Sequence, residues 1–142
     1  MNVAVILKEK GHDVATTSAK ATLQEAASQL TARRIGALVV MEDGRISGIF
    51  SERDLVGAIG REGPAALNRT VGEAMSKRVA TCELNDSIGE LMDRMTDGRF
   101  RHLPVIEGGK MIGIVSIGDV VKHRIAETVM EAEAMKLYIA QN

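Results

Sequence analysis

Two short segments of this sequence place an aspartate three residues after a serine: Ser51-Glu-Arg-Asp54 and Ser116-Ile-Gly-Asp119. An aspartate carboxylate can accept hydrogen bonds from both hydroxyls of a ribose, and a serine hydroxyl can donate one to a phosphate. The pair of motifs therefore suits the binding of a ribonucleotide. The simpler interpretation is that each motif only caps the start of a helix, because Ser-x-x-Asp before an apolar run is a capping box.

Two features of these segments favour binding in addition to capping. Gly48 and Gly113 each lie three residues before the serine, inside a predicted strand, where glycine often marks the close approach of a ligand or of another backbone segment. The start of a helix also attracts anions, because its free N–H groups and its dipole favour phosphate. Capping and nucleotide binding are compatible, and both interpretations stay open at this point.

The two motifs end two copies of an internal repeat, residues 14–56 and 79–121, which align without a gap and are identical at about a third of their positions. Half of this chain would bury too little surface to be stable alone, so the copies are expected to pack together. The pattern in each copy predicts a strand, a helix, two strands and a second helix. Residues 57–78 are predicted to form a linker and lead-in helix, and residues 122–142 a C-terminal helix.

Local signals support this order of elements. Thr22 and Ser87 each precede a glutamate by three residues, which predicts capping boxes at the first helix of each copy. Apolar residues then recur on one helix face, and two short apolar runs follow, joined by a turn, which predicts a β-hairpin. The predicted strands are Ala37–Met41 and Ile46–Phe50 in the first copy and Leu103–Ile106 and Met111–Val115 in the second, with turns at Asp43-Gly44 and Gly108-Gly109.

The order of elements, the endings Gly-Ile-Phe-Ser-Glu-Arg-Asp and Gly-Ile-Val-Ser-Ile-Gly-Asp, and the run Arg-His-Leu-Pro-Val all resemble the cystathionine-β-synthase (CBS) domain family. The resemblance covers about residues 3–125. It implies an α+β fold in which two pseudo-symmetric CBS repeats pack as one Bateman module. In members that bind nucleotides the aspartate contacts the ribose, which implies Asp54 and Asp119 as ribose ligands, with Ser51 and Ser116 nearer phosphate.

The resemblance also implies that each site is shared between the repeats. One site would join Ser116, Asp119, Arg101 and His102 to Lys20, Ile35 and Gly36, and the other would join Ser51, Arg53 and Asp54 to Asn85 and Phe100. The two sites are chemically unequal, because Arg53 corresponds to Gly118, and Arg101 and His102 correspond to Gly36 and Ala37. The alternatives are a solvated surface charge for Arg53 and Lys20, and a salt bridge or polar pair for Arg101 and His102.

Composition and the remaining motifs argue against other classes of function. The net charge of −1 gives no electrostatic case for nucleic acid or an acidic membrane. The single cysteine, Cys82, fits a reducing compartment, and no apolar run is long enough for a signal peptide or a membrane helix. His12, His102 and His123 lack metal-ligand spacing, and no catalytic motif is present, so no catalytic or metal-binding residue is predicted.

The C-terminal segment has apolar or small residues alternating by four and three: Val121, Ile125, Thr128, Ala132, Met135 and Ile139. This spacing predicts a helix with a heptad seam that is shorter than most coiled coils. This helix either docks on its own domain or pairs with the same helix of a second copy.

The sequence thus predicts a cytoplasmic regulatory protein and not an enzyme. It would bind AMP, ADP, ATP or NAD(H), need no other cofactor, form a homodimer, and act in trans on an unknown protein effector. The alternatives are a ligand-free structural interaction module and, less favoured, a nucleotide-processing enzyme.

Overall fold

The computed structural model describes residues 1–142 and divides the chain into two compact units. The first-repeat unit comprises residues 14–79, and the second-repeat unit comprises residues 1–13 together with residues 80–142. The N-terminal segment therefore belongs with the second repeat, although it precedes the first in the chain.

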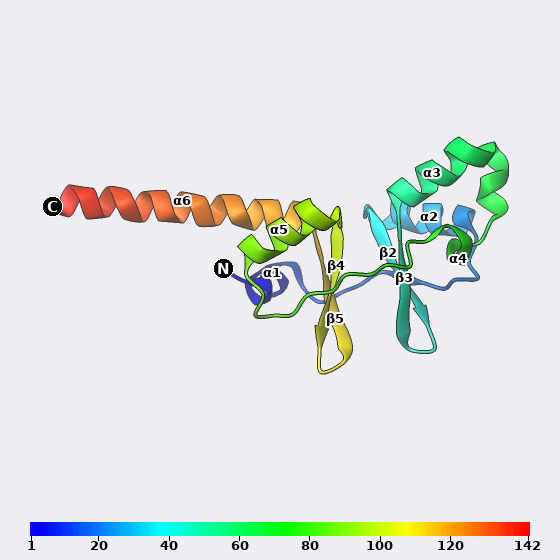
Figure 1. The fold of residues 1–142 in the computed structure, drawn as a ribbon, viewed down its shortest axis with the longest axis horizontal. Helices are drawn as coiled ribbons and strands as arrows, with labels where there is room; N and C mark the ends of the chain where they lie inside the picture. The colour runs from blue at the N-terminus through cyan, green and yellow to red at the C-terminus, as the bar shows by residue number, and fades with distance from the viewer. The chain divides into compact units, whose positions relative to one another are not determined.

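The first-repeat unit is a small sheet with helices (Figure 1). Strand β1 pairs parallel with β2, and β2 pairs antiparallel with β3. The turn between β2 and β3 has positive φ at both Asp43 and Gly44, the conformation that two-residue hairpins require. The elements are β1 (Thr16–Thr17), α2 (Leu23–Arg33), β2 (Ala37–Glu42), β3 (Arg45–Ser51), α3 (Glu52–Glu62), the 3-10 helix η1 (Gly63–Asn68) and α4 (Val71–Ala74).

The second-repeat unit repeats this plan around the antiparallel pair of β4 and β5. Gly108 and Gly109 both have positive φ in the turn between them. The elements are α1 (Val3–Lys10), α5 (Ile88–Gly98), β4 (His102–Glu107), β5 (Lys110–Ser116) and α6 (Ile117–Gln141). The helix predicted over residues 122–142 is the continuation of α6.

The predicted order of elements holds throughout the first repeat but not at the start of the second. No strand forms over residues 79–82; Cys82 makes only an isolated parallel bridge to Val105. In the first repeat the N–H of Val39 donates to the carbonyl of Ala15 and extends the pairing to two residues. The residue corresponding to Val39 is Pro104, which has no N–H to donate, so the second ladder is shorter.

The helix starts follow the predicted capping chemistry. The side chains of Thr22 and Ser87 accept hydrogen bonds from the backbone N–H groups of Glu25 and Glu90, both at 3.1 Å. These bonds satisfy donors that the first turn of a helix leaves without intrahelical partners. Ser51 and Ser116 cap α3 and α6 in the same way.

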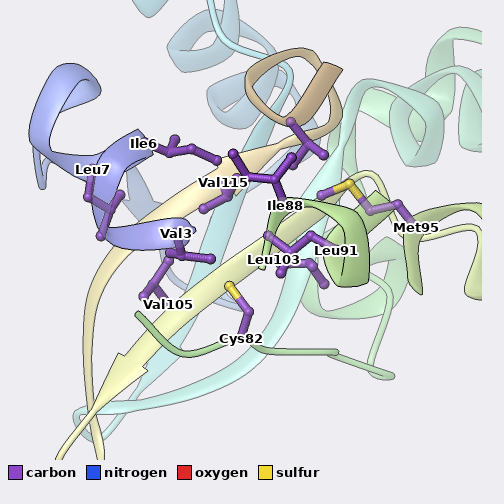
Figure 2. Close-up of a cluster of buried hydrophobic side chains, with 11 residues drawn as sticks. Val3, Ile6, Leu7, Cys82, Ile88, Leu91, Met95, Leu103, Val105 and Val115 are labelled. Carbon is purple, nitrogen blue, oxygen red and sulfur yellow. The ribbon is translucent and has the colours of Figure 1, made fainter. Parts of the chain in front are cut away.

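The core of the second-repeat unit depends on α1. Val3, Ile6 and Leu7 are at most 1% exposed, and Figure 2 shows their side chains directed toward those of the strands and α5. This cluster also contains Cys82, Ile88, Leu91, Met95, Leu103, Val105, Val115 and Val120. The separate core of the first-repeat unit contains Leu23, Ala26, Leu30, Leu38, Val40, Phe50, Ala58, Ala66 and Val71.

Candidate functional site

The two Ser-x-x-Asp motifs have nearly the same geometry in the two units. In the first, the N–H of Ser51 donates to Oδ2 of Asp54 at 2.9 Å, and Ser51 Oγ accepts from the Asp54 N–H at 3.4 Å. In the second, the corresponding distances between Ser116 and Asp119 are 2.9 and 3.2 Å. The capping interpretation is therefore correct for both motifs.

Capping does not use the whole carboxylate. The cap occupies Oδ2 of each aspartate, while Oδ1 of Asp54 accepts only a long hydrogen bond of 3.4 Å from Ser76 Oγ. An ionised carboxylate has about four lone-pair positions. Both half-buried aspartates thus keep acceptor capacity at the start of a helix, where it can serve a ligand with neighbouring hydroxyls.

In the second-repeat unit, four of the predicted residues lie at one end of the β4–β5 hairpin. His102 pairs with Ser116 across the hairpin, and the N–H of Ile117 donates to the carbonyl of Arg101 at 2.8 Å. Arg101 is exposed, and Asp119 follows in the first turn of α6. A cationic side chain and the positive end of a long helix are thus brought together, which suits an anionic group.

The first-repeat unit has the same arrangement of backbone with its charges at different positions. Ala37 pairs with Ser51, and the N–H of Glu52 donates to the carbonyl of Gly36 at 3.0 Å. Gly36 therefore lies beside the start of α3, and Arg53 is exposed in its first turn. The residues that make the two predicted sites chemically unequal therefore occupy equivalent positions in the folds of the two repeats.

Short lead-in helices hold the two loops that carry Lys20 and Asn85. In the first-repeat unit, the N–H groups of Val71 and Gly72 in α4 donate to the carbonyls of Ala21 and Ala19, on either side of Lys20. In the second-repeat unit, the N–H groups of Val3 and Ala4 in α1 donate to the carbonyls of Asp86 and Leu84, on either side of Asn85. Each helix thus fixes the backbone at one predicted ligand residue.

Ile35 and Phe100, at corresponding positions of the repeats, are both half-buried and pack against the core of their own unit. Ile35 also lines a hollow of about 250 Å³ between α2 and α3. The predicted pairing of Asp119 with Lys20, Ile35 and Gly36 joins residues of different units. The same is true of the pairing of Asp54 with Asn85 and Phe100, and both pairings stay predictions.

Sequence reasoning missed a lysine at the second motif. Lys10, at the end of α1, places Nζ 2.6 Å from Oδ2 of Asp119 and 2.9 Å from the carbonyl oxygen of Ile114. Burial acts to raise the pKa of Asp119, but the hydrogen bonds from Lys10 and from Ser116 outweigh burial and hold that pKa below its ordinary value. Asp119 is thus a carboxylate kept ionised by a neighbouring cation.

Nothing in the spacing of the sequence indicated Lys10, because it precedes the first repeat and yet packs on the second. Its counterpart beside the first motif is Met75, so the lysine adds to the inequality of the sites. The neighbouring Glu9 also contacts α6, through Lys122 at 2.9 Å and through Nε2 of the buried His123 at 2.9 Å. The end of α1 is therefore held against the first turns of α6.

Gly48 and Gly113 are buried positions approached by protein atoms. A Cβ added at Gly48 would lie 2.6 Å from Sδ of Met75 and 2.8 Å from the carbonyl oxygen of Ser76. A Cβ added at Gly113 would lie 2.8 Å from the side chain of Leu7. At both positions glycine is therefore explained by close packing of protein atoms, from residues 75 and 76 at Gly48 and from Leu7 of α1 at Gly113.

No group of three or more His, Cys, Asp or Glu side chains is placed to hold a metal ion. Cys82 is buried, which raises its thiol pKa to about 12. His12 has its Nδ1 2.9 Å from the carbonyl oxygen of Ile112. None of the helices has the length and apolar character needed to cross a membrane.

Comparison with solved structures places this fold among proteins with paired CBS domains. The crystal structure of the CBS-domain containing protein ATU1752 from Agrobacterium tumefaciens is 49% identical, with a TM-score of 0.85 over 87% of this chain and 99% of that chain. The CBS domain pair of protein MJ0100 is 22% identical, with a TM-score of 0.75 over 86% of this chain and 98% of that chain. At that identity the likeness shows the fold alone.

Curated relatives agree in family but differ in length. The CBS domain-containing protein YhcV of Bacillus subtilis is 32% identical over 80% of this chain and 80% of its own length. The mitochondrial CBS domain-containing protein CBSX3 of Arabidopsis thaliana is 36% identical over 83% of this chain, but only 60% of its own length is covered. The CBS domain pattern itself matches residues 10–61 and 71–126. The chain therefore belongs to the CBS domain family and carries two CBS repeats.

Proposed function

We propose that this chain is a regulatory module that binds an adenine nucleotide, one of AMP, ADP, ATP or NAD(H). The observation that carries the proposal is the duplicated Ser-x-x-Asp motif, whose aspartates keep acceptor capacity after capping, beside Arg101 in one repeat and Arg53 in the other. The pair from MJ0100, which shares the fold, was crystallised with 5-methylthioadenosine and S-adenosyl-L-methionine, and both ligands contain adenosine.

Binding would regulate by favouring one arrangement of the module over another, which requires different affinities for the two. The output would be delivered in trans to a protein effector from a homodimer located in the cytoplasm. We do not propose a catalytic role, because the thiol of Cys82 is buried, its pKa is raised, and neither motif places a nucleophile beside a general base.

The ribose role of the aspartates is tested by titration calorimetry of Asp119→Asn and Asp54→Asn with AMP and with its 2′,3′-dideoxy analogue. Asparagine keeps an oxygen that can accept the cap hydrogen bond, so the fold should survive. Loss of a charge-assisted hydrogen bond should weaken binding about ten- to hundredfold. Asp93→Asn, on the exposed surface of α5, is the matched control and should bind as the wild type does. Equal binding of AMP and the dideoxy analogue by the wild type would contradict the proposal.

The shared character of the sites is tested by double-mutant cycles. Lys20→Ala should couple to Asp119→Asn, because we propose that both residues contact the same ligand, and it should add independently to Asp54→Asn. Arg53→Ala should couple to Asp54→Asn. Coupling of Lys20 to Asp54 and not to Asp119 would show that the assignment of residues to sites is wrong.

A further inference from the structure

The last turns of α6 form a helical surface that the second-repeat unit does not cover. Every residue from Thr128 to Asn142 is exposed, and Figure 1 shows this part of α6, in orange and red, running away from α1 and α5 of its own unit. The stretch also lies beyond the match to the CBS domain pattern, which ends at residue 126. We define residues 128–141 as the tail.

The tail is too apolar for a helix that stays in water. Its side chains include large hydrophobic groups that are 54–66% exposed: Val129, Met130, Met135, Leu137, Tyr138 and Ile139. A helix of this length without packing is marginal in water, and an apolar helix surface normally indicates burial. Of these, Met135 and Ile139 lie on one helix face together with Ile125 just before the tail, and this face is the one for which we seek a partner. Docking of the tail on its own unit, one of the two sequence predictions, is not what the structure shows.

We propose that the partner is the tail of a second copy, paired in parallel as a short two-stranded coiled coil. The seam begins at Ile125, just before the tail, and continues along one helix face through Thr128, Ala132, Met135 and Ile139, spaced alternately by three and four. Ile125 and Ile139 fall at a positions, where β-branched residues favour two parallel strands. The small Ala132 at the central a position lets the helices approach closely.

The charges beside the seam fit the parallel arrangement. Glu131 precedes an a position and Lys136 follows a d position, so they occupy g and e sites. In a parallel pair, Glu131 of each copy faces Lys136 of the other, giving two symmetric ion pairs. Lys136 is 75% exposed, and its ion pair within the chain, with Glu133 at 3.5 Å, is long and exposed enough to be exchanged for another. An antiparallel pair would not bring Glu131 and Lys136 together.

Disulfide trapping of the full chain tests the proposal. Ile139→Cys places a thiol on the seam, and Leu137→Cys places one two residues away on the opposite face. The two side chains are similarly exposed, at 66% and 63%, so neither change should affect folding. Native Cys82 is 2% exposed and supplies no competing thiol. Because paired thiols have a millimolar effective concentration, I139C should form dimers at least about tenfold faster than L137C at micromolar protein.

A second substitution in the same chain tests which face of the tail forms the contact between copies. In the I139C background, Met135→Asp should slow the cross-link, and Leu137→Asp should not. Glu131→Lys should also slow it, and adding Lys136→Glu should restore the rate. Equal rates for I139C and L137C, as when copies associate only through other surfaces, would overturn the proposal.

An antiparallel pairing gives a different outcome. It would hold the two copies of residue 139 about 16 Å apart along the axis. Residue 139 would then lie opposite residue 128, so cross-linking of Thr128→Cys with Ile139→Cys in a mixture, without I139C homodimers, would also overturn the proposal. None of these readouts depends on nucleotide, so they are independent of the proposed binding function.

Discussion

At the scale of single residues, the second motif differs from the first because a lysine from another part of the chain reaches its aspartate. Lys10 and Asp119 are 33% and 25% exposed, which leaves their ion pair partly shielded from water. In the first repeat the corresponding aspartate accepts from Ser51 and, weakly, from Ser76, both neutral groups. Asp119 thus has a cationic partner that its counterpart in the first repeat lacks, although the repeat pattern makes the two aspartates equivalent.

Replacing Lys10 by methionine, the residue at the corresponding position of the first repeat, should make the stability less dependent on pH. The folded state holds the pKa of Asp119 low, so the ionised aspartate contributes stability above its unfolded pKa and loses it as pH falls through the folded pKa. Lys10→Met should lower the free energy of unfolding by about 1 kcal/mol at pH 7, since a partly exposed pair is worth little more. Below pH 4 the difference from the wild type should shrink toward zero.

Urea unfolding at a series of pH values from 7 to 3 measures this difference. Lys122→Met is the matched control, because it removes the more exposed ion pair with Glu9 at the same end of α1. Its effect on the free energy of unfolding should be clearly smaller than that of Lys10→Met, because water screens an exposed pair. A Lys10→Met difference that stays constant down to pH 3 would show that Asp119 is not the group responsible.

At the scale of elements, each hairpin is built to receive a lead-in segment. Ile49 of β3 and Ser76 exchange backbone hydrogen bonds of 2.9 and 3.0 Å, which fixes the segment after α4 against the strand beside Gly48. In the second-repeat unit, α1 approaches the equivalent glycine through the side chain of Leu7 instead. Equivalent glycines thus face a backbone oxygen in one repeat and a flexible side chain in the other.

Gly48→Ala should therefore destabilise the protein more than Gly113→Ala does. The new methyl group at residue 48 meets the carbonyl of Ser76, which cannot move without straining two hydrogen bonds, at a cost of about 1–3 kcal/mol. At residue 113 the new methyl group meets only the end of the Leu7 side chain, which can shift more easily than a hydrogen-bonded backbone, so the cost should be smaller. Chemical denaturation of the two variants compares them directly, and a larger loss for Gly113→Ala would reverse this interpretation.

At the scale of the whole molecule, one unit is inserted into the sequence of the other. Residues 1–13 belong to the second-repeat unit, and the lead-in helix before the second repeat belongs to the first. The chain thus leaves the second-repeat unit, builds all of the first-repeat unit and then returns. The first-repeat unit is therefore one continuous segment, inserted between the two parts of the second-repeat unit.

Leu7→Ala should consequently weaken the second repeat, although residue 7 precedes the first. Leu7 is 1% exposed, and truncating a buried leucine costs about 2–5 kcal/mol. Hydrogen exchange followed by mass spectrometry should show loss of protection over residues 80–142 first. Leu23→Ala, at 0% exposure in the other core, is the control and should affect residues 14–79 first. The opposite pattern for Leu7→Ala would contradict the division into units.

The sequence by itself determined the elements that local chemistry controls. The hairpins follow from turn residues that tolerate positive φ, and the helix starts follow from side chains that accept hydrogen bonds from free N–H groups. Duplication then made the family recognisable and identified both Ser-x-x-Asp motifs. Each of these signals lies within a few residues of its effect, so it can be seen without knowledge of the fold.

Tertiary structure decided what depends on residues distant in sequence. Nothing near Asp119 in the chain indicates that Lys10 binds it, and nothing near Val3, Ile6 or Leu7 indicates that they complete the second core. Residues 79–82 form no strand because the residue that lies opposite them in the fold is Pro104, which has no N–H to donate. In each case hydrophobic burial brings together segments that are far apart in the chain. The stabilisation depends on the apolar area removed from water and not on sequence order, so neither segment alone predicts which segment it will contact.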